Sequence, residues 1–119
     1  MIDIEMIRNY ILTKPYVEEC FPFDEVTLVF KVGRKMFALI PLDAELLSIN
    51  LKCMPDLALE LREKHDGVKP GYHMNKTHWN TISINNEAYN FKTIQSWIDI
   101  SYNLVYEALP KKIKAILVE

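Results

Sequence analysis

At 119 residues with 50% hydrophobic side chains, the chain is long enough for one domain with a single core and too short for two. Charged residues make up 25% and aromatic residues 11%, a composition that excludes intrinsic disorder. The net charge of −2 argues against extensive phosphate binding, but it is uneven: residues 1–60 hold six Lys or Arg against ten Asp or Glu (net −4), and residues 61–119 hold eight against six (net +2).

The cysteines and the N-terminus indicate the cellular compartment. Cys20 and Cys53 are too few for a disulfide framework or a thiolate metal site, so we expect reduced thiols. The opening Met-Ile-Asp-Ile-Glu lacks the basic start and apolar core of a signal peptide, and no apolar run reaches the length of a membrane span. We therefore expect a soluble, cytoplasmic protein that is monomeric.

The first half of the chain predicts one helix followed by three strands. Asp3 is a typical N-cap for a helix whose isoleucines recur at helical spacing and which Pro15 ends. The acidic, proline-containing residues 16–25 are predicted to form an ordered loop. The strands are rich in β-branched and apolar residues, and a tight turn at Gly33 joins the first two into a hairpin. They are Val26–Val32, Lys35–Pro41 and Leu46–Lys52.

The second half predicts a helix, two extended segments and a long helix. Pro55 suits the first position of a helix that Gly67 ends. A turn at Asn85-Asn86 follows the second extended segment. Phe91–Leu109 has the apolar spacing of a long helix, and a basic helical tail, Lys111–Val118, comes after it. The two extended segments are Gly71–Met74 and His78–Ile84.

The resulting order, α-β-β-β-α-β-β-α, predicts a single α+β domain with two layers, in which helices cover one face of an antiparallel sheet. Because side chains alternate along a strand, Ile82 and Ile84 can face the core only if Trp79 faces the opposite way. We therefore predict an open, solvent-exposed sheet face on which a tryptophan lies among lysines and amides, suited to stacking on bases or gripping a peptide. Its predicted members are Thr27, Val29, Lys31, Ser48, Asn50, Lys52, Trp79, Thr81 and Ser83.

Residues 69–81 are the most distinctive segment, because they combine cations, imidazoles, amides and aromatic rings, with no acidic residue between Asp66 and Glu87. Lysines there would neutralise phosphates, amides and imidazoles would bond phosphates or base edges, and the indole would stack. Alternatively, Asn75 and His78 satisfy backbone groups in a tight turn while the tryptophan packs on its neighbours. The candidate nucleic-acid-binding residues are Lys31, Lys52, Lys69, His73, Asn75, Lys76, His78, Trp79 and Asn80.

The sequence does not indicate catalytic or metal chemistry. His65, His73 and His78 would need a further ligand for zinc, and no Cys or carboxylate occurs between residues 67 and 86. Cys53 precedes a predicted helix whose dipole would lower its pKa, but the sequence gives it no base, which favours a buried structural thiol. We therefore expect a protein that is not an enzyme and uses no metal or cofactor.

Three segments resemble the MmcQ/YjbR-like family of small bacterial proteins, and the resemblance covers nearly the whole chain. Residues 69–81 carry its most specific part, and residues 24–39 and 48–53 carry the rest. One departure is Tyr16, where the family often has glycine. The resemblance implies a two-layer fold similar to CyaY-like and secretion-chaperone-like domains, also described as a double-wing DNA-binding arrangement.

The same resemblance implies a partner and the positions that contact it. DNA binding is the family's customary label, and the family suggests no catalytic residue. A peptide or other protein partner on the same surface is the alternative, which the net charge favours. The positions carried over by the resemblance are Lys69, His73, Asn75, Lys76, His78 and Trp79.

Overall fold

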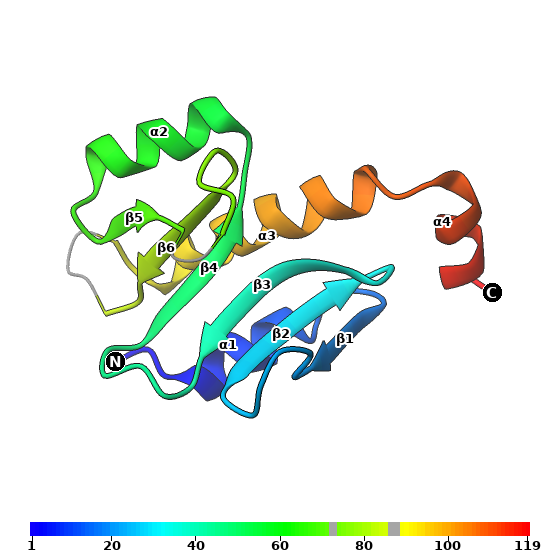
Figure 1. Cartoon of the computed structure of the whole chain (residues 1–119), viewed down its shortest axis with the longest axis horizontal. Coiled ribbons are helices and arrows are strands. Elements are labelled where there is room, and N and C mark those ends of the chain that lie inside the picture. Colours follow the sequence, from blue (N-terminus) through cyan, green and yellow to red (C-terminus); the bar gives the residue numbers. More distant parts are fainter. Residues whose placement is uncertain (72–73, 86–88) are drawn as a thin grey trace.

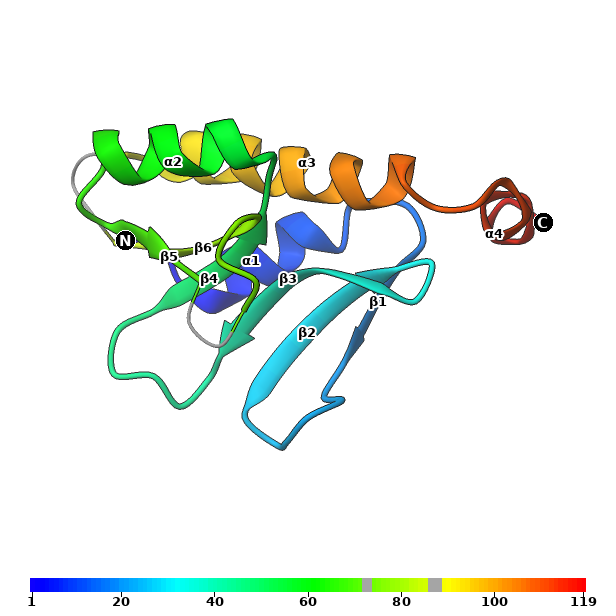
Figure 2. The ribbon, with the colours of Figure 1, turned by 45° about the horizontal axis from the view of Figure 1, so that its top comes forward.

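The structure is a computed structural model that describes residues 1–71, 74–85 and 89–119. Its strands form one antiparallel sheet in the order β1-β2-β3-β4-β6-β5, and α1, α2 and α3 cover one face of it (Figures 1 and 2). The predicted two-layer α+β fold is confirmed, with an additional strand, β1, and the tail helix α4. The elements are α1 Ile4–Ile11, β1 Val17–Cys20, β2 Thr27–Val32, β3 Lys35–Pro41, β4 Ser48–Lys52, α2 Pro55–Lys64, β5 Val68–Pro70, β6 Trp79–Ser83, α3 Phe91–Glu107 and α4 Lys111–Leu117.

Local sequence explains where the helices begin. Asp3 Oδ1 accepts a hydrogen bond from the backbone N–H of Met6 at 2.9 Å, and Pro55 is the first residue of α2, as predicted. Asn90 caps α3 in the same way as Asp3 caps α1. Within the described part of the chain, no helix is both long and apolar enough to cross a membrane.

Two local predictions are wrong. Residues 17–20 form an edge strand rather than part of a loop, because Val17 packs on the core while the segment pairs with β2. The short strand before β6 is Val68–Pro70 rather than Gly71–Met74, since the buried Val68 lies opposite Ile82. Positions 72 and 73 of the predicted strand, and Asn86 of the predicted turn, lie outside the described residues.

A side chain from α3 separates the two central strands. β3 and β4 pair at only two register positions, and beyond them the hydroxyl of Ser101 lies between the strands. It accepts a hydrogen bond from Lys52 N at 2.9 Å and donates one to Phe37 O at 2.6 Å. A shift in the β2–β3 register gives Phe37 no partner on β2, which marks a β-bulge. The two halves of the sheet therefore diverge, and the face away from the helices is concave (Figure 2).

Tyr16 adopts a backbone conformation that usually selects glycine. Its φ of 64° lies in the left-handed region. The ring stacks on Tyr106, with centroids 6.4 Å apart and planes 16° apart, and the neighbouring Pro15 O accepts a hydrogen bond from Tyr102 at 2.5 Å. Contacts with α3 thus offset the backbone strain of a non-glycine residue in the left-handed conformation at this turn.

Replacing Ser101 with alanine should lower the free energy of unfolding by about 2 kcal/mol, because the part-buried N–H of Lys52 and the buried carbonyl of Phe37 would both lose their partner. Urea unfolding followed by tryptophan fluorescence measures this change. Ser96→Ala is the control, since among the described residues the Ser96 hydroxyl bonds only the carbonyl of Thr93 within the same helix. Equal stability of the two variants would contradict the bridging role of Ser101.

Tyr16→Ala should be less stable than Tyr16→Gly by about 1 kcal/mol, because both variants lose the stacked ring but only alanine keeps the left-handed strain. Thermal unfolding of the two variants gives the difference directly. An alanine variant at least as stable as the glycine variant would show that this turn does not hold a left-handed residue.

Candidate functional site

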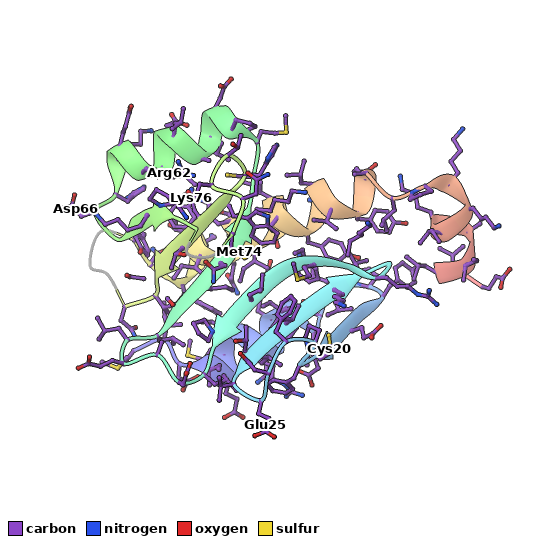
Figure 3. The ribbon with its side chains drawn as sticks, in the orientation of Figure 1. Cys20, Glu25, Arg62, Asp66, Met74 and Lys76 are labelled. Atoms are coloured by element: carbon purple, nitrogen blue, oxygen red, sulfur yellow. The ribbon has the colours of Figure 1, made fainter. Side chains whose placement is uncertain are left out.

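The concave face of the sheet contains a groove of about 950 Å³. A small apolar cluster, separate from the helix-side core, underlies it. We call it the open-face cluster: Val29, Leu39 and Trp79, with Cys20, Met36 and Met74 packed against them. Figure 3 labels Cys20 on the β1 side and Met74 on the segment that precedes β6. The groove is lined by Phe23, Asp24, Thr27, Met36, Leu39, Pro41, Asp43, Ala44, Ser48, Asn50, Met74, Asn75, Trp79 and Thr81.

Trp79 lies on the predicted face of the sheet but is not exposed. Only 7% of its surface is accessible, because the preceding segment folds back against it. Gly71 N donates to Trp79 O at 2.8 Å, and a Cβ added to Gly71 would lie 2.9 Å from the Trp79 Cβ. Met74 packs on the same cluster. The prediction of an exposed stacking platform is therefore wrong, and the indole forms part of a groove wall instead.

Arg62 of α2 fixes the backbone on which Trp79 sits. Its Nε donates to Asn80 Oδ1 at 2.6 Å, and its Nη2 donates to the carbonyl oxygens of Trp79, at 3.3 Å, and of Lys76. Asn80 is 1% exposed and also donates to Ala58 O at 3.3 Å. Its side chain thus faces α2 rather than the groove, and the prediction that it contacts a partner is wrong because strand alternation turns it inward with Ile82.

The turn before β6 uses its polar residues internally. Asn75 Oδ1 accepts from Thr77 N at 2.9 Å, and Asn75 O accepts from Trp79 N at 2.9 Å. Lys76 Nζ donates to Gly71 O at 3.1 Å. His78 O accepts from the backbone N–H of the residue after β4 at 2.9 Å. These contacts support the structural interpretation of the turn, while His73 lies outside the described residues.

The other candidate lysines are dispersed. Lys31 lies opposite Glu18 across β1 and β2, Lys52 lies opposite Trp79 across β4 and β6, and Lys69 lies on the edge strand β5. Among the described residues that line the groove, none is a lysine, arginine or histidine. The charges on the groove are instead the carboxylates of two aspartates.

Nucleophilic and metal chemistry receive no support from the geometry. Burial raises the pKa of the Cys53 thiol, which opposes the activation expected of a nucleophile. The ring of His65 packs edge-on against Tyr89 and Trp97. Within residues 1–71, 74–85 and 89–119, no group of three His, Cys, Asp or Glu side chains could hold a metal ion.

The sequence analysis missed several residues of the groove, above all Asp24, Met36, Leu39 and Asp43. A signal for the two aspartates was available. The β2–β3 hairpin has acidic residues in the loops at one end and three cations, Lys-Val-Gly-Arg-Lys at 31–35, at the other. The two apolar residues were harder to assign, because the bulge at the start of β3 interrupts simple alternation.

The architecture defines a class of small α+β proteins in which helices cover one face of an antiparallel sheet and the other face is open and concave. A model of the YjbR family matches residues 12–104, and the chain therefore belongs to the YjbR family. The resemblance inferred from the sequence is confirmed.

Relatives of known sequence or structure match most of the chain. The uncharacterised protein YbdF of Escherichia coli O157:H7 is 36% identical over 91% of this chain and 88% of its own, and the uncharacterised protein YjbR of E. coli K12 is 29% identical over 98% of both. The crystal structure of Deinococcus radiodurans protein DR2400, a DUF419 domain, has a TM-score of 0.88 at 33% identity and covers 97% of this chain and 87% of its own. A Pseudomonas syringae protein has a TM-score of 0.75 at 29% identity, over 87% of this chain and 99% of its own.

Replacing Arg62 with lysine should lower the free energy of unfolding by about 2 kcal/mol, because one ammonium cannot replace the guanidinium fork on three oxygens. In a Trp97→Phe background, where Trp79 is the remaining tryptophan, its emission should also shift to the red as the ring becomes more exposed. Arg34→Lys makes the same chemical change at an exposed turn and should alter neither quantity. An unchanged Trp79 spectrum in Arg62→Lys would show that the hydrogen bonds of Arg62 do not hold Trp79 in its buried position in the groove.

Proposed function

We propose that this protein is a non-enzymatic interaction module that binds an extended peptide segment of a partner protein in the open-face groove. The observation that carries this proposal is the composition of the groove: an apolar floor, amide and hydroxyl side chains, two carboxylates, and no cation among the described lining residues. Such a lining removes apolar side chains of a peptide from water and leaves polar groups for its backbone.

The apolar part of the groove has the properties of an adaptable peptide site. Met36 and Met74 are partly buried and flexible, and thioether side chains adjust to ligands of different shape. Phe23, which also lines the groove, is 64% exposed, so it offers apolar surface that a ligand would cover.

Asn50 supplies a polar anchor between these apolar groups. It is 9% exposed, and its Oδ1 accepts a hydrogen bond from the Thr81 hydroxyl at 2.5 Å. Its Nδ2 has no hydrogen-bond partner in the described part of the chain, and the residue lines the groove. A peptide carbonyl is the natural acceptor for such a donor.

DNA is the weaker candidate because the charges of the groove oppose it. Phosphates need positive potential, whereas Asp24 and Asp43 line the groove and the lysines predicted for DNA contact lie outside it. Lys76 is also engaged with a backbone carbonyl. A nucleic acid bound elsewhere on the protein would use a different surface from the groove.

The binding test uses peptides selected from a random octapeptide library displayed on phage, with affinities then measured by fluorescence anisotropy of labelled synthetic peptides. Met36→Gln with Met74→Gln should weaken binding about tenfold or more, because two apolar contacts are lost at nearly constant side-chain size. Met6→Gln with Met54→Gln makes the same change at exposed positions outside the groove and should leave the affinity within twofold.

Binding of duplex DNA is the result that would contradict this proposal. The proposal predicts that a 20-base-pair duplex neither displaces the peptide nor binds at physiological salt. If the duplex does bind, with affinity falling by a slope of about −0.9 per phosphate contact, and Lys69→Glu with Lys76→Glu abolishes that binding, the DNA assignment holds instead.

A further inference from the structure

Resting on the peptide-binding role proposed above, we propose that the groove and a second cavity beside it together select peptides of defined charge polarity. A basic end lies against Asp24 and Asp43, apolar side chains cover the open-face cluster, and an acidic end or terminal carboxylate lies against Lys35 and Lys52. The ligand class is thus an extended, charge-polarised peptide.

The acidic end of the groove is built at the start of β2 and just after β3. The carboxylate of Asp24 accepts hydrogen bonds from the N–H groups of Val26 and Thr27, at 2.9 and 2.7 Å, and from the Thr27 hydroxyl at 3.1 Å. These bonds lower the pKa of Asp24 and fix its carboxylate at the groove. Asp43 lines the same groove from the loop after β3 and has no ion pair with a described residue, so its charge is available to a ligand.

The basic end is a second cavity of about 370 Å³ beside the first. Lys35 and Lys52 line it together with apolar residues at the end of α3, including Val105 and Leu109. In the described part of the chain, neither lysine forms an ion pair. An anionic group would therefore find cations next to apolar surface here.

The two cavities are neighbours across the centre of the sheet. Met36 and Trp79 line both of them. The charged ends are separated along β3, whose seven residues correspond to about 20 Å at about 3.3 Å per residue. An extended segment of six or seven residues has the same length. Figure 3 shows Glu25, next to Asp24, at the end of β2 remote from the hairpin turn, so acids and cations lie at opposite ends of the hairpin.

The polarity test repeats the octapeptide selection on three proteins. The unmodified protein should enrich peptides with Arg or Lys near one end, Asp or Glu near the other, and apolar residues between them. Asp24→Asn with Asp43→Asn should abolish only the preference for the basic end, since asparagine retains the turn-forming acceptor of Asp24. Lys35→Gln with Lys52→Gln should abolish only the preference for the acidic end.

Measured affinities complete the test. Each double neutralisation should weaken a peptide selected on the unmodified protein about fivefold or more, and 0.5 M NaCl should reduce that difference. Glu63→Gln with Lys64→Gln, exposed on α2 and outside both cavities, is the control and should change neither selection nor affinity. Enrichment of peptides without charge polarity, or with the same polarity on all three proteins, would overturn this inference while leaving peptide binding intact. A selection that enriches no peptide above a blank surface would overturn the proposed function itself.

Discussion

The hydroxyl of Ser101 between β3 and β4 is the interaction on which the open face depends. Two hydrogen bonds in series, from Lys52 N to the hydroxyl and from the hydroxyl to Phe37 O, stand where a direct strand-to-strand bond would continue the ladder. The strands separate at this point without leaving a buried polar group unpaired, because the inserted hydroxyl serves both sides. A helix on one face of the sheet thereby sets the curvature of the other face, and the shape of the groove is coupled to the packing of α3 on the core.

The curvature of the sheet determines whether the Trp79 ring is exposed to a ligand. Alternation along β6 correctly predicts the side of the sheet that carries the indole, but alternation contains no information about whether that side is flat or concave. In a concave sheet, side chains of β2, β3 and β6 converge, and Val29, Leu39 and Trp79 bury one another. The close approach of Gly71, which a Cβ would prevent, then closes one side of the ring. An aromatic residue on an uncovered sheet face is therefore no evidence of an aromatic stacking surface.

The sequence predicts most of the architecture because local signals and hydrophobic periodicity agree at nearly every element. The sequence prediction fails at elements whose structure is determined by a long-range contact. β1 is short and contains Glu18 and Glu19, so no propensity signal marks it, and its pairing with β2 defines it instead. Asn80 is different: once Ile82 is assigned to the core, alternation already turns Asn80 inward, and only its amide suggested a contact with a partner. The groove itself could not be predicted, because it results from the Ser101 bridge and the bulge at β3 acting together.

The distribution of charge also explains why composition is a poor guide to the partner. A net charge of −2 and a basic second half describe averages over the sequence, whereas the hairpin of β2 and β3 carries acids at one end and cations at the other. Such an arrangement contributes less to overall affinity than to orientation, since a ligand bound in the reverse direction would bring like charges together at both ends. A polyanion such as DNA would be attracted by the lysines of the second cavity and repelled by the aspartates of the groove. In the proposed complex, a short peptide with charges of both signs is attracted at both ends, and its apolar centre covers the cluster that the sheet leaves partly open.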